Sequence, residues 1–233
     1  MIRYALLIAA ALPGQALAQA YQCRAPQQLE LLQPPQPDGP RRDTPITGYT
    51  LAISWSPEFC RGGSAAKDPR NYQCNGSIGR FGFVLHGLWP ESGPGKYPQW
   101  CSLTPRPSVA DLKANLCMTP VPSLLEHEWA KHGSCMARTP AVYFKTAQAM
   151  WKAVRLPDAD RLSRQPGLTA GDLRRAFVTL NPRIPIAAIG VRTGNGWLRE
   201  VHLCYDRKFK FAACTAAKFG PKNDISLNIW RGL

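Results

Sequence analysis

Hydrophobic and polar residues alternate along two segments in the first half of the chain, residues 49–54 and 80–86. A period of two places every second side chain on the same face of an extended backbone, which is typical of a β-strand with one buried face. The side chains expected on the buried faces are Leu51, Ile53, Trp55, Phe81, Phe83 and Leu85. His86 would then lie on the opposite face, at the end of the second strand.

Two further strands are predicted near the C-terminus, at residues 186–192 and 197–205. The segment between them reads Gly194-Asn195-Gly196. Asn-Gly is a strong signal for a β-hairpin because both residues tolerate a positive φ. We therefore expect these two strands to pair antiparallel.

Helices are predicted where hydrophobic residues recur every three or four positions after a capping signal. The helix after Pro140 has the best pattern, since Tyr143, Ala147 and Trp151 share one face. Helices and strands do not alternate regularly, so the sequence predicts an α+β fold with a mainly antiparallel central sheet flanked by helices. The capping signals are Ser108 with Asp111, Ser123 with Glu126, Thr139 with Pro140, and Thr169 with Asp172.

Two segments carry residues typical of irregular structure. Residues 33–47 hold five prolines, which remove backbone donors and forbid a helix, so we expect an extended arm. Residues 57–79 are rich in glycine, proline and asparagine, and we expect a long loop there.

The chain begins with a segment typical of a secretory signal peptide. Arg3 precedes an apolar stretch, and small-residue cleavage sites end at Ala18 and Ala20. The apolar stretch is shorter than the ~20 residues of a membrane-spanning helix. No later stretch is apolar for longer, so we expect no stable membrane association. The expected organisation is a signal peptide at residues 1–20, a proline-rich N-terminal arm at residues 21–48 and a single catalytic domain at residues 49–233.

All eight cysteines follow the predicted signal peptide. An even number of cysteines in an exported chain indicates disulfides. A zinc site is disfavoured because no two cysteines lie about two to four residues apart, as paired zinc ligands usually do. The formal net charge of +14 favours the binding of polyanions. Nucleic acid, anionic lipid or acidic polysaccharide would all fit that charge.

The segment of residues 126–135 gathers polar groups on one arc of a predicted helix. With the 3.6-residue period, Lys131 and Glu128 lie about 40° and about 100° around the axis from His127. His132 lies at about 140° by the same period. Two imidazoles, an ammonium and a carboxylate on one arc are unfavourable unless they are solvated or share a task.

A zinc hydrolase is one alternative for this segment. Metalloprotease helices carry His-Glu-x-x-His, with both histidines one turn apart. Here the spacing is His-Glu-x-x-x-His, which separates His127 and His132 by about 140°. A shared metal ion is thereby disfavoured, and we expect neither a metal nor another cofactor.

RNA cleavage needs two imidazoles but no metal ion, because the 2′-hydroxyl of RNA is itself the nucleophile. A neutral imidazole accepts the 2′ proton and an imidazolium protonates the departing 5′ oxygen, and the ordinary histidine pKa of ~6.5 suits both tasks. His86, in the segment FVLHGLWP, and His132 are the candidate pair. Lys131 and His127 would stabilise negative charge on the phosphate. Glu128 would orient His132 or hydrogen-bond the phosphate region.

Two glycines are expected to shape this site. Gly87 would let the backbone turn so that Trp89 reaches a place beside His86. Gly133 would end the helix as a C-terminal cap.

The segments FVLHGLWP and HEWAKHGSC closely resemble the two active-site segments of the ribonuclease T2 family. The segments LAISWSPEFC (51–60) and LREVHLCYD (198–206) are similar to the family's first strand and C-terminal strand. The resemblance implies a ribonuclease T2-like fold and an endoribonuclease that cleaves single-stranded RNA through a 2′,3′-cyclic phosphate. Hydrolysis of that intermediate would give a 3′-phosphate, without a metal ion.

The resemblance also assigns roles to single residues. His86 and His132 become the acid/base pair, and which of them is the base in the first step stays open. Base preference stays open as well. The other assigned residues are His127, Glu128 and Lys131 around the phosphate, Trp89 as a base-stacking residue, and Glu91 and Tyr97 in the base-binding region.

For the cysteines, the resemblance supports three pairings. They are Cys101 with Cys135, Cys204 with Cys214, and Cys60 with Cys74. Cys23 and Cys117 are left over, and their pairing stays open. We therefore expect a disulfide-stapled, monomeric protein that is periplasmic or secreted.

One histidine falls outside both motifs. His202 shares a strand face with Glu200 and matches no catalytic motif, so we expect it to be structural or solvent-facing. The alternative to an enzyme is a non-catalytic polyanion-binding protein on the same scaffold. It predicts loss of one member of the His86 and His132 pair, and both are present.

Overall fold

The computed structural model of the protein describes residues 22–30, 33–93 and 97–232. The predicted signal peptide, residues 1–20, lies outside these ranges. Among the described residues, no helix is both long and apolar enough to cross a membrane.

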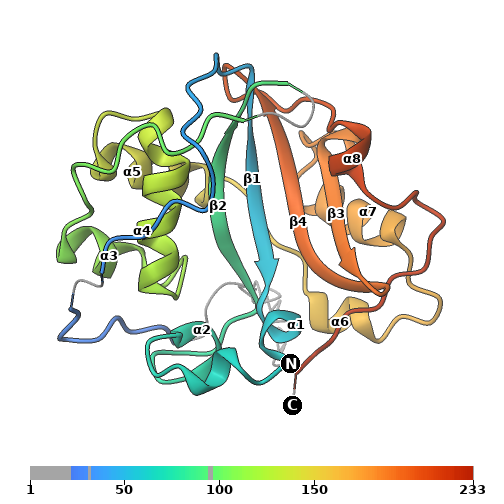
Figure 1. Cartoon of the computed structure of the whole chain (residues 1–233). Coiled ribbons are helices and arrows are strands. Elements are labelled where there is room, and N and C mark those ends of the chain that lie inside the picture. The colour runs from blue at the N-terminus through green and yellow to red at the C-terminus, as the bar shows by residue number, and fades with distance from the viewer. Residues whose placement is uncertain (1–21, 31–32, 94–96, 233) are drawn as a thin grey trace, which may run out of the picture.

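A four-stranded antiparallel sheet with the order β2-β1-β4-β3 forms the centre of the fold (Figure 1). The predicted α+β fold with a mainly antiparallel sheet is confirmed. β3 and β4 form the predicted hairpin, and its two-residue turn consists of Asn195 and Gly196, both with positive φ. The strands are β1 (Gly48–Trp55), β2 (Phe83–Glu91), β3 (Ile189–Gly194) and β4 (Trp197–Asp206).

Helices lie beside both edges of the sheet. In Figure 1, α3, α4 and α5 lie beside β2, whereas α7 and α8 lie beside β3. The α-helices are α1 (Ser56–Cys60), α2 (Tyr72–Asn75), α3 (Val109–Asn115), α4 (Pro122–Lys131), α5 (Pro140–Lys152), α6 (Ala159–Ser163), α7 (Ala170–Leu180) and α8 (Ala216–Phe219). Short 3-10 turns are η1 (Ala65–Lys67), η2 (Gly133–Cys135) and η3 (Ile186–Ala188).

Three of the four predicted capping signals start helices. Capping boxes at Ser108 and Thr169 begin α3 and α7, and the Thr139 side chain caps α5. The prediction for Ser123 was wrong, because α4 begins one residue before it with Val121 at the N-cap position. A proline at the first helical position makes this start favourable without a polar cap, since it has no N–H to satisfy.

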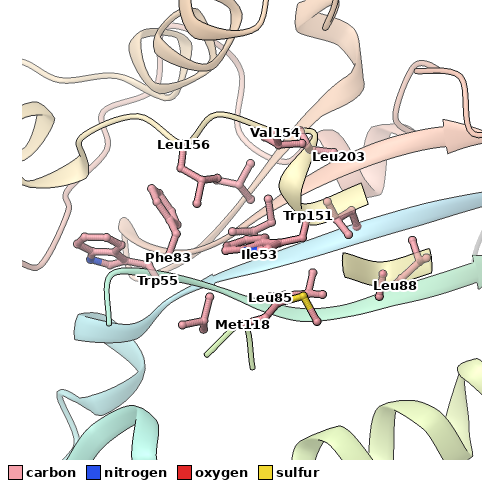
Figure 2. Close-up of a cluster of buried hydrophobic side chains, with 14 of the residues drawn as sticks. Ile53, Trp55, Phe83, Leu85, Leu88, Met118, Trp151, Val154, Leu156 and Leu203 are labelled. Carbon is pink, nitrogen blue, oxygen red and sulfur yellow. The ribbon is translucent and has the colours of Figure 1, made fainter. Parts of the chain in front are cut away.

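The hydrophobic core lies on one face of the sheet. Figure 2 shows Ile53, Leu85 and Leu203 from three neighbouring strands packed against side chains from α5 and the segment that follows it. Trp151 and Val154 supply part of that cover and are almost fully buried. The opposite face of the sheet is therefore left for polar side chains.

Three predicted boundaries shift in the structure. The second strand begins at Phe83 and continues to Glu91, because β1 pairs with it along its whole length. Residues 186–188 form a 3-10 turn instead of the start of a strand. The predicted loop at residues 57–79 holds α1, η1 and α2, and the Cys60–Cys74 disulfide links the two helices.

The N-terminal arm, described at residues 22–30 and 33–47, contains no helix in those ranges. It forms a single β-bridge, between Arg42 and Gln99. This bridge places the arm against the segment between β2 and α3.

Four disulfides cross-link the chain. They are Cys23–Cys117, Cys60–Cys74, Cys101–Cys135 and Cys204–Cys214. Three are the pairings that the sequence resemblance implied, and the fourth joins the two cysteines that it left over. Four disulfides are typical of a protein that leaves the reducing cytosol.

Candidate active site

His86 lies in the middle of β2, not at the end of a strand as predicted. Ala52 pairs with Gly87 and Ile53 pairs with Leu85, so His86 is the extra residue of a β-bulge. A bulge bends the strand locally and changes the direction of a side chain. Here it turns the imidazole toward the polar face of the sheet.

Two carboxylates face the imidazole of His86. Nδ1 lies 2.6 Å from Glu200 Oε1, and Nε2 lies 3.5 Å from Glu128 Oε1. Burial would lower the pKa of His86, but the hydrogen bond to Glu200 and the charge of Glu128 outweigh burial and raise this pKa above its ordinary value. The environment therefore favours the protonated imidazolium.

Glu200 is a site residue that the sequence motifs did not reveal. Besides His86, its carboxylate accepts hydrogen bonds from Ser54 Oγ at 2.9 Å and from His202 Nε2 at 2.9 Å. Burial would raise the pKa of Glu200, but the hydrogen bonds from His202 and His86 lower it well below its usual range. Glu200 is thus a fixed anion behind His86.

His202 is buried and hydrogen-bonded to Glu200, so a solvent-facing position is wrong and a structural one is supported. Its ring also lies edge-on to Trp89, with the centroids 5.4 Å apart. His202 therefore helps to hold Glu200 in place through its hydrogen bond, although it belongs to neither sequence motif.

Glu128 projects from α4 onto β2. Its Oε2 accepts a hydrogen bond from Trp89 Nε1 at 2.7 Å, and Oε1 faces His86. Of its two predicted tasks, orienting His132 has no contact to support it among the described residues, and a hydrogen bond to the phosphate region stays a prediction. Burial raises the pKa of Glu128 to about 7, although the charge of His86 and the Trp89 hydrogen bond oppose that rise. A Cβ at Gly87 would overlap the Glu128 carboxylate. Gly87 thus provides space for Glu128, and Trp89 lies beside His86 as predicted.

His132 occupies the C-cap position of α4 and is almost completely buried. Its Nδ1 is buried without a hydrogen-bond partner among the described residues. Burial, followed by the positive charges of Lys131 and His127, lowers the pKa of His132 well below its ordinary value. The neutral imidazole is therefore favoured here.

Trp89 lies between the two candidate catalytic histidines. Its ring centroid is 5.1 Å from that of His86 and 5.5 Å from that of His132. Because its indole is also hydrogen-bonded to Glu128, Trp89 fixes the relative positions of the strand and the helix. The side chain remains partly exposed.

Lys131 and His127 lie near each other beside Trp100. The Lys131 ammonium is 5.9 Å from the Trp100 ring, and the His127 ring is edge-on to it at 5.3 Å. Burial, and next the charge of Lys131, lowers the pKa of His127. The site thus holds one fixed cation next to a weakly basic imidazole.

Asp38, from the N-terminal arm, contacts this cation. Its carboxylate lies 2.6 Å from Lys131 Nζ and accepts a hydrogen bond of 3.0 Å from Trp100 Nε1. The hydrogen bond to Lys131 lowers the pKa of Asp38. The motifs gave no sign of this contact, which places a carboxylate where a phosphate oxygen would be expected to bind.

Helix α4 ends two residues before Gly133, near the predicted boundary, but His132 and not Gly133 is its C-cap residue. Gly133 opens η2, and a Cβ there would lie 2.7 Å from both Trp129 and Tyr143. Close packing therefore requires glycine at this position. The Cys101–Cys135 disulfide then ties η2 to the segment following β2.

The two predicted base-binding residues differ in their surroundings. Glu91 forms an ion pair with Lys218 and accepts a hydrogen bond of 2.8 Å from Thr50 Oγ1, so its carboxylate is already engaged. Tyr97 lies near His132, with the ring centroids 5.8 Å apart, and the Arg42 guanidinium is 4.8 Å from its ring centroid. Of the two, only Tyr97 contacts a candidate catalytic residue.

A cavity of about 590 Å³ opens beside His86 and His127. Its walls include Pro35 and Gln36 of the N-terminal arm and the exposed ring of Phe59. Within the described residues, no group of three or more His, Cys, Asp or Glu side chains is arranged to hold a metal ion. The site thus places an imidazole with a raised pKa and an imidazole with a lowered pKa near a lysine ammonium.

Comparison with known proteins shows sequence similarity over most of the chain. The profile of the Ribonuclease T2 family matches residues 47–214. A probable ribonuclease of Haemophilus influenzae is 32% identical over 190 residues, which are 76% of this chain and 64% of that protein. A ribonuclease of Aeromonas hydrophila is 41% identical over 87 residues, 37% of this chain and 36% of that protein. The matches thus span less than two thirds of either bacterial relative.

Solved structures resemble the chain at lower identity. An RNase-related protein from Calystegia sepium superposes with a TM-score of 0.60 at 21% identity, over 78% of this chain and 97% of that one. RNase NT in complex with 5′-AMP gives a TM-score of 0.59 at 22% identity, over 79% of this chain and 99% of that one. At such identities the likeness establishes the fold alone.

Proposed function

The chain belongs to the ribonuclease T2 family, and we propose that it is a metal-independent endoribonuclease that cleaves single-stranded RNA through a 2′,3′-cyclic phosphate. Hydrolysis of the cyclic intermediate then gives a 3′-phosphate. The observation that carries the proposal is the contrast between His86, which faces two carboxylates, and His132, which is buried beside cations. General acid–base catalysis needs one proton donor and one proton acceptor at the same pH.

The contrast supports one direction of proton transfer. His132 is the base: its buried Nδ1 leaves Nε2 available to accept the proton of the 2′-hydroxyl. The 2′ oxygen then attacks phosphorus, and the bond from phosphorus to the 5′ oxygen breaks. His86 is the acid, and its imidazolium donates a proton to the departing 5′ oxygen.

The second step reverses these roles. His86, now neutral, takes a proton from water, whose oxygen attacks the cyclic phosphate. His132, now protonated, returns its proton to the 2′ oxygen as that oxygen leaves phosphorus. Both histidines end in the protonation states in which they began, so the enzyme turns over without a metal ion or other cofactor.

The other site residues hold charge and geometry. Lys131 stabilises the negative charge that develops on the phosphate oxygens, after the phosphate displaces Asp38 from the ammonium. His127 lies next to Lys131 and contacts the same phosphate. Glu128 and Glu200 keep His86 protonated and oriented.

The compartment follows from the cross-links. Four disulfides and the predicted signal peptide at residues 1–20 support a mature protein that is periplasmic or secreted. We further propose that residues 49–233 act as one catalytic domain, as a monomer, with the N-terminal arm folded against it.

The test is cleavage of single-stranded RNA by the purified mature protein in excess EDTA. A 2′,3′-cyclic product should appear first and convert to a 3′-phosphate. A zinc hydrolase would lose activity in EDTA. A non-catalytic polyanion-binding protein would retain RNA but leave it intact between about pH 4 and pH 8, and that result would contradict the proposal.

A further inference from the structure

A row of polar side chains crosses the sheet from His86 to the opposite edge. Strand pairing places Ser54 of β1 opposite Glu200 of β4, and Glu200 opposite Arg192 of β3. Directly paired residues of antiparallel strands project on the same face of a sheet. Since His86 reaches Glu200 from β2, the row reads His86, Ser54, Glu200 and Arg192.

Arg199 joins this row through a second β-bulge. Arg192 pairs with Glu200 and Thr193 pairs with Leu198, so Arg199 is the extra residue of β4. Its guanidinium lies over Gly194, where a Cβ would overlap it. The glycine thus lets the Arg199 side chain lie along the sheet next to Arg192.

The two arginines line a cavity of about 440 Å³ whose wall is shared with the active site. Ser54, Phe59 and Glu200 line both this cavity and the cavity that contains His86 and His127. A path bordered by these three residues therefore leads from the reacting phosphate to Arg192 and Arg199.

The carboxylates along this path are already engaged. Glu200 is hydrogen-bonded to two histidines, and Glu58 lies 3.4 Å from Arg61. Arg192 donates one hydrogen bond, to the carbonyl oxygen of Ala217 at 2.9 Å. Among the described residues, neither Arg192 nor Arg199 has a carboxylate within ion-pair distance.

Both arginine side chains are exposed, so their remaining donors can bind a ligand. A guanidinium offers a rigid fork of donors that matches the oxygens of a phosphate. Two such forks at the end of a path from the active site fit an anionic polymer better than a single small anion.

We propose that Arg192 and Arg199 form a second phosphate subsite, which binds the phosphodiester that follows the leaving nucleotide on its 3′ side. This inference rests on the proposed function, because it takes His86, whose cavity adjoins that of the two arginines, as the acid that protonates the leaving 5′ oxygen. The imidazole of His86 contacts Glu200, and Arg192 is the cross-strand partner of Glu200, one strand spacing of about 4.8 Å away. A separation of that order suits the phosphate one linkage beyond the scissile one.

Two matched substrates test the subsite. The first has one ribonucleotide followed by one deoxynucleotide, so it contains only the scissile phosphate. The second adds a further deoxynucleotide at the 3′ end, which supplies one downstream phosphate but no second cleavable linkage. The wild type should cleave the longer substrate with the higher kcat/KM.

The variant is the double substitution Arg192→Gln and Arg199→Gln, and the control is Arg155→Gln. Arg155 is exposed between Val154 and Leu156, which belong to the core on the other face of the sheet (Figure 2). The double variant should lose about tenfold in kcat/KM on the longer substrate, as expected for loss of charge-assisted contacts. Its activity on the shorter substrate should stay within about twofold of wild type, because that substrate lacks the phosphate these arginines bind.

A salt titration gives an independent readout. Release of counterions from one phosphate of a single strand contributes a slope of about −0.7 to the dependence of log affinity on log salt. The double variant should lose about that much slope on the longer substrate, and Arg155→Gln should keep the wild-type slope.

The outcomes separate the two proposals. If the wild type cleaves neither substrate, the proposed function fails. If it cleaves both equally well, or the double variant keeps the length advantage or loses equal activity on both, the second phosphate subsite is wrong while the ribonuclease proposal stands.

Discussion

His86 and His132 have the same side chain but lie in surroundings of opposite charge. His86 comes from a strand and faces Glu200 and Glu128, whereas His132 ends a helix and is buried near Lys131 and His127. The carboxylates raise the pKa of His86, and burial together with the charge of Lys131 lowers the pKa of His132. The two imidazoles therefore hold different protonation states over a common range of pH.

This difference shows how one residue type supplies both halves of an acid–base pair. Nothing in the imidazoles themselves distinguishes acid from base. The distinction comes from what the sheet and α4 place around each ring, so changes to the neighbours should alter the roles in predictable directions.

The largest effect is expected from removing either ring. His86→Phe and His132→Phe should each lower kcat by about 100- to 10,000-fold, because a positioned general acid or base contributes about 10²–10⁴. Single-turnover cleavage of RNA measures the loss, and thermal unfolding shows whether the fold is intact. A folded variant with near wild-type turnover would show that the pair is misassigned.

A smaller effect is expected from weakening the acid alone. In the wild type, kcat/KM should fall at low pH as His132 becomes protonated and at high pH as His86 loses its proton. Glu200→Gln removes a negative charge from His86, so the pKa of His86 falls and the high-pH limb moves to lower pH. The expected shift is about one to two pH units, given about 1.5–3 kcal/mol for a charged hydrogen bond and 1.36 kcal/mol per unit.

Ser54→Ala is the matched control for this prediction. It removes the hydrogen bond that the uncharged Ser54 hydroxyl donates to the same Glu200 oxygen, and it leaves the negative charge of Glu200 in place. Its high-pH limb should stay near that of the wild type. Equal shifts in both variants would mean that general packing, and not the Glu200 charge, determines the pH at which the high-pH limb falls.

The smallest effect is expected on the cationic side of the comparison. Asp38→Asn frees Lys131 from an ion pair that the incoming phosphate must otherwise displace. The Asp38 side chain is 52% exposed, and exposed pairs contribute only about 0.2–1 kcal/mol. KM should therefore fall by up to about fivefold with kcat unchanged, as steady-state kinetics on RNA would show.

The neighbouring arm residue Asp43 provides the control, because it pairs with Arg41 at the surface. Asp43→Asn changes the net charge by the same amount away from Lys131. If both variants lower KM equally, general charge is responsible and the Asp38 contact has no specific role.

Local features of the fold were predictable from the sequence. The capping boxes at Ser108 and Thr169 involve residues three positions apart, and the Asn195–Gly196 turn needs only its own backbone preference. Such signals depend on only a few neighbouring residues, so the tertiary structure does not override them. The prediction that Ser123 caps α4 was wrong because the helix begins one residue earlier, at Pro122.

The candidate site was predictable only in part. The helical period brought His127, Glu128, Lys131 and His132 to one arc, but the partners of these residues come from far away in the chain. Glu200 is 114 residues from His86, and Asp38 is 93 residues from Lys131. Strand order, the bulge at His86 and the path of the arm create these contacts, and none of them has a local signature.

The most direct test of the central claim is a pH titration of the imidazole NMR signals in the free protein. The chain has four histidines, so single His→Phe variants can assign each signal. We expect a pKa for His86 above the ordinary value of ~6.5 and a pKa for His132 below it. A pKa of His132 equal to or higher than that of His86 would contradict the assignment of His86 as acid and His132 as base.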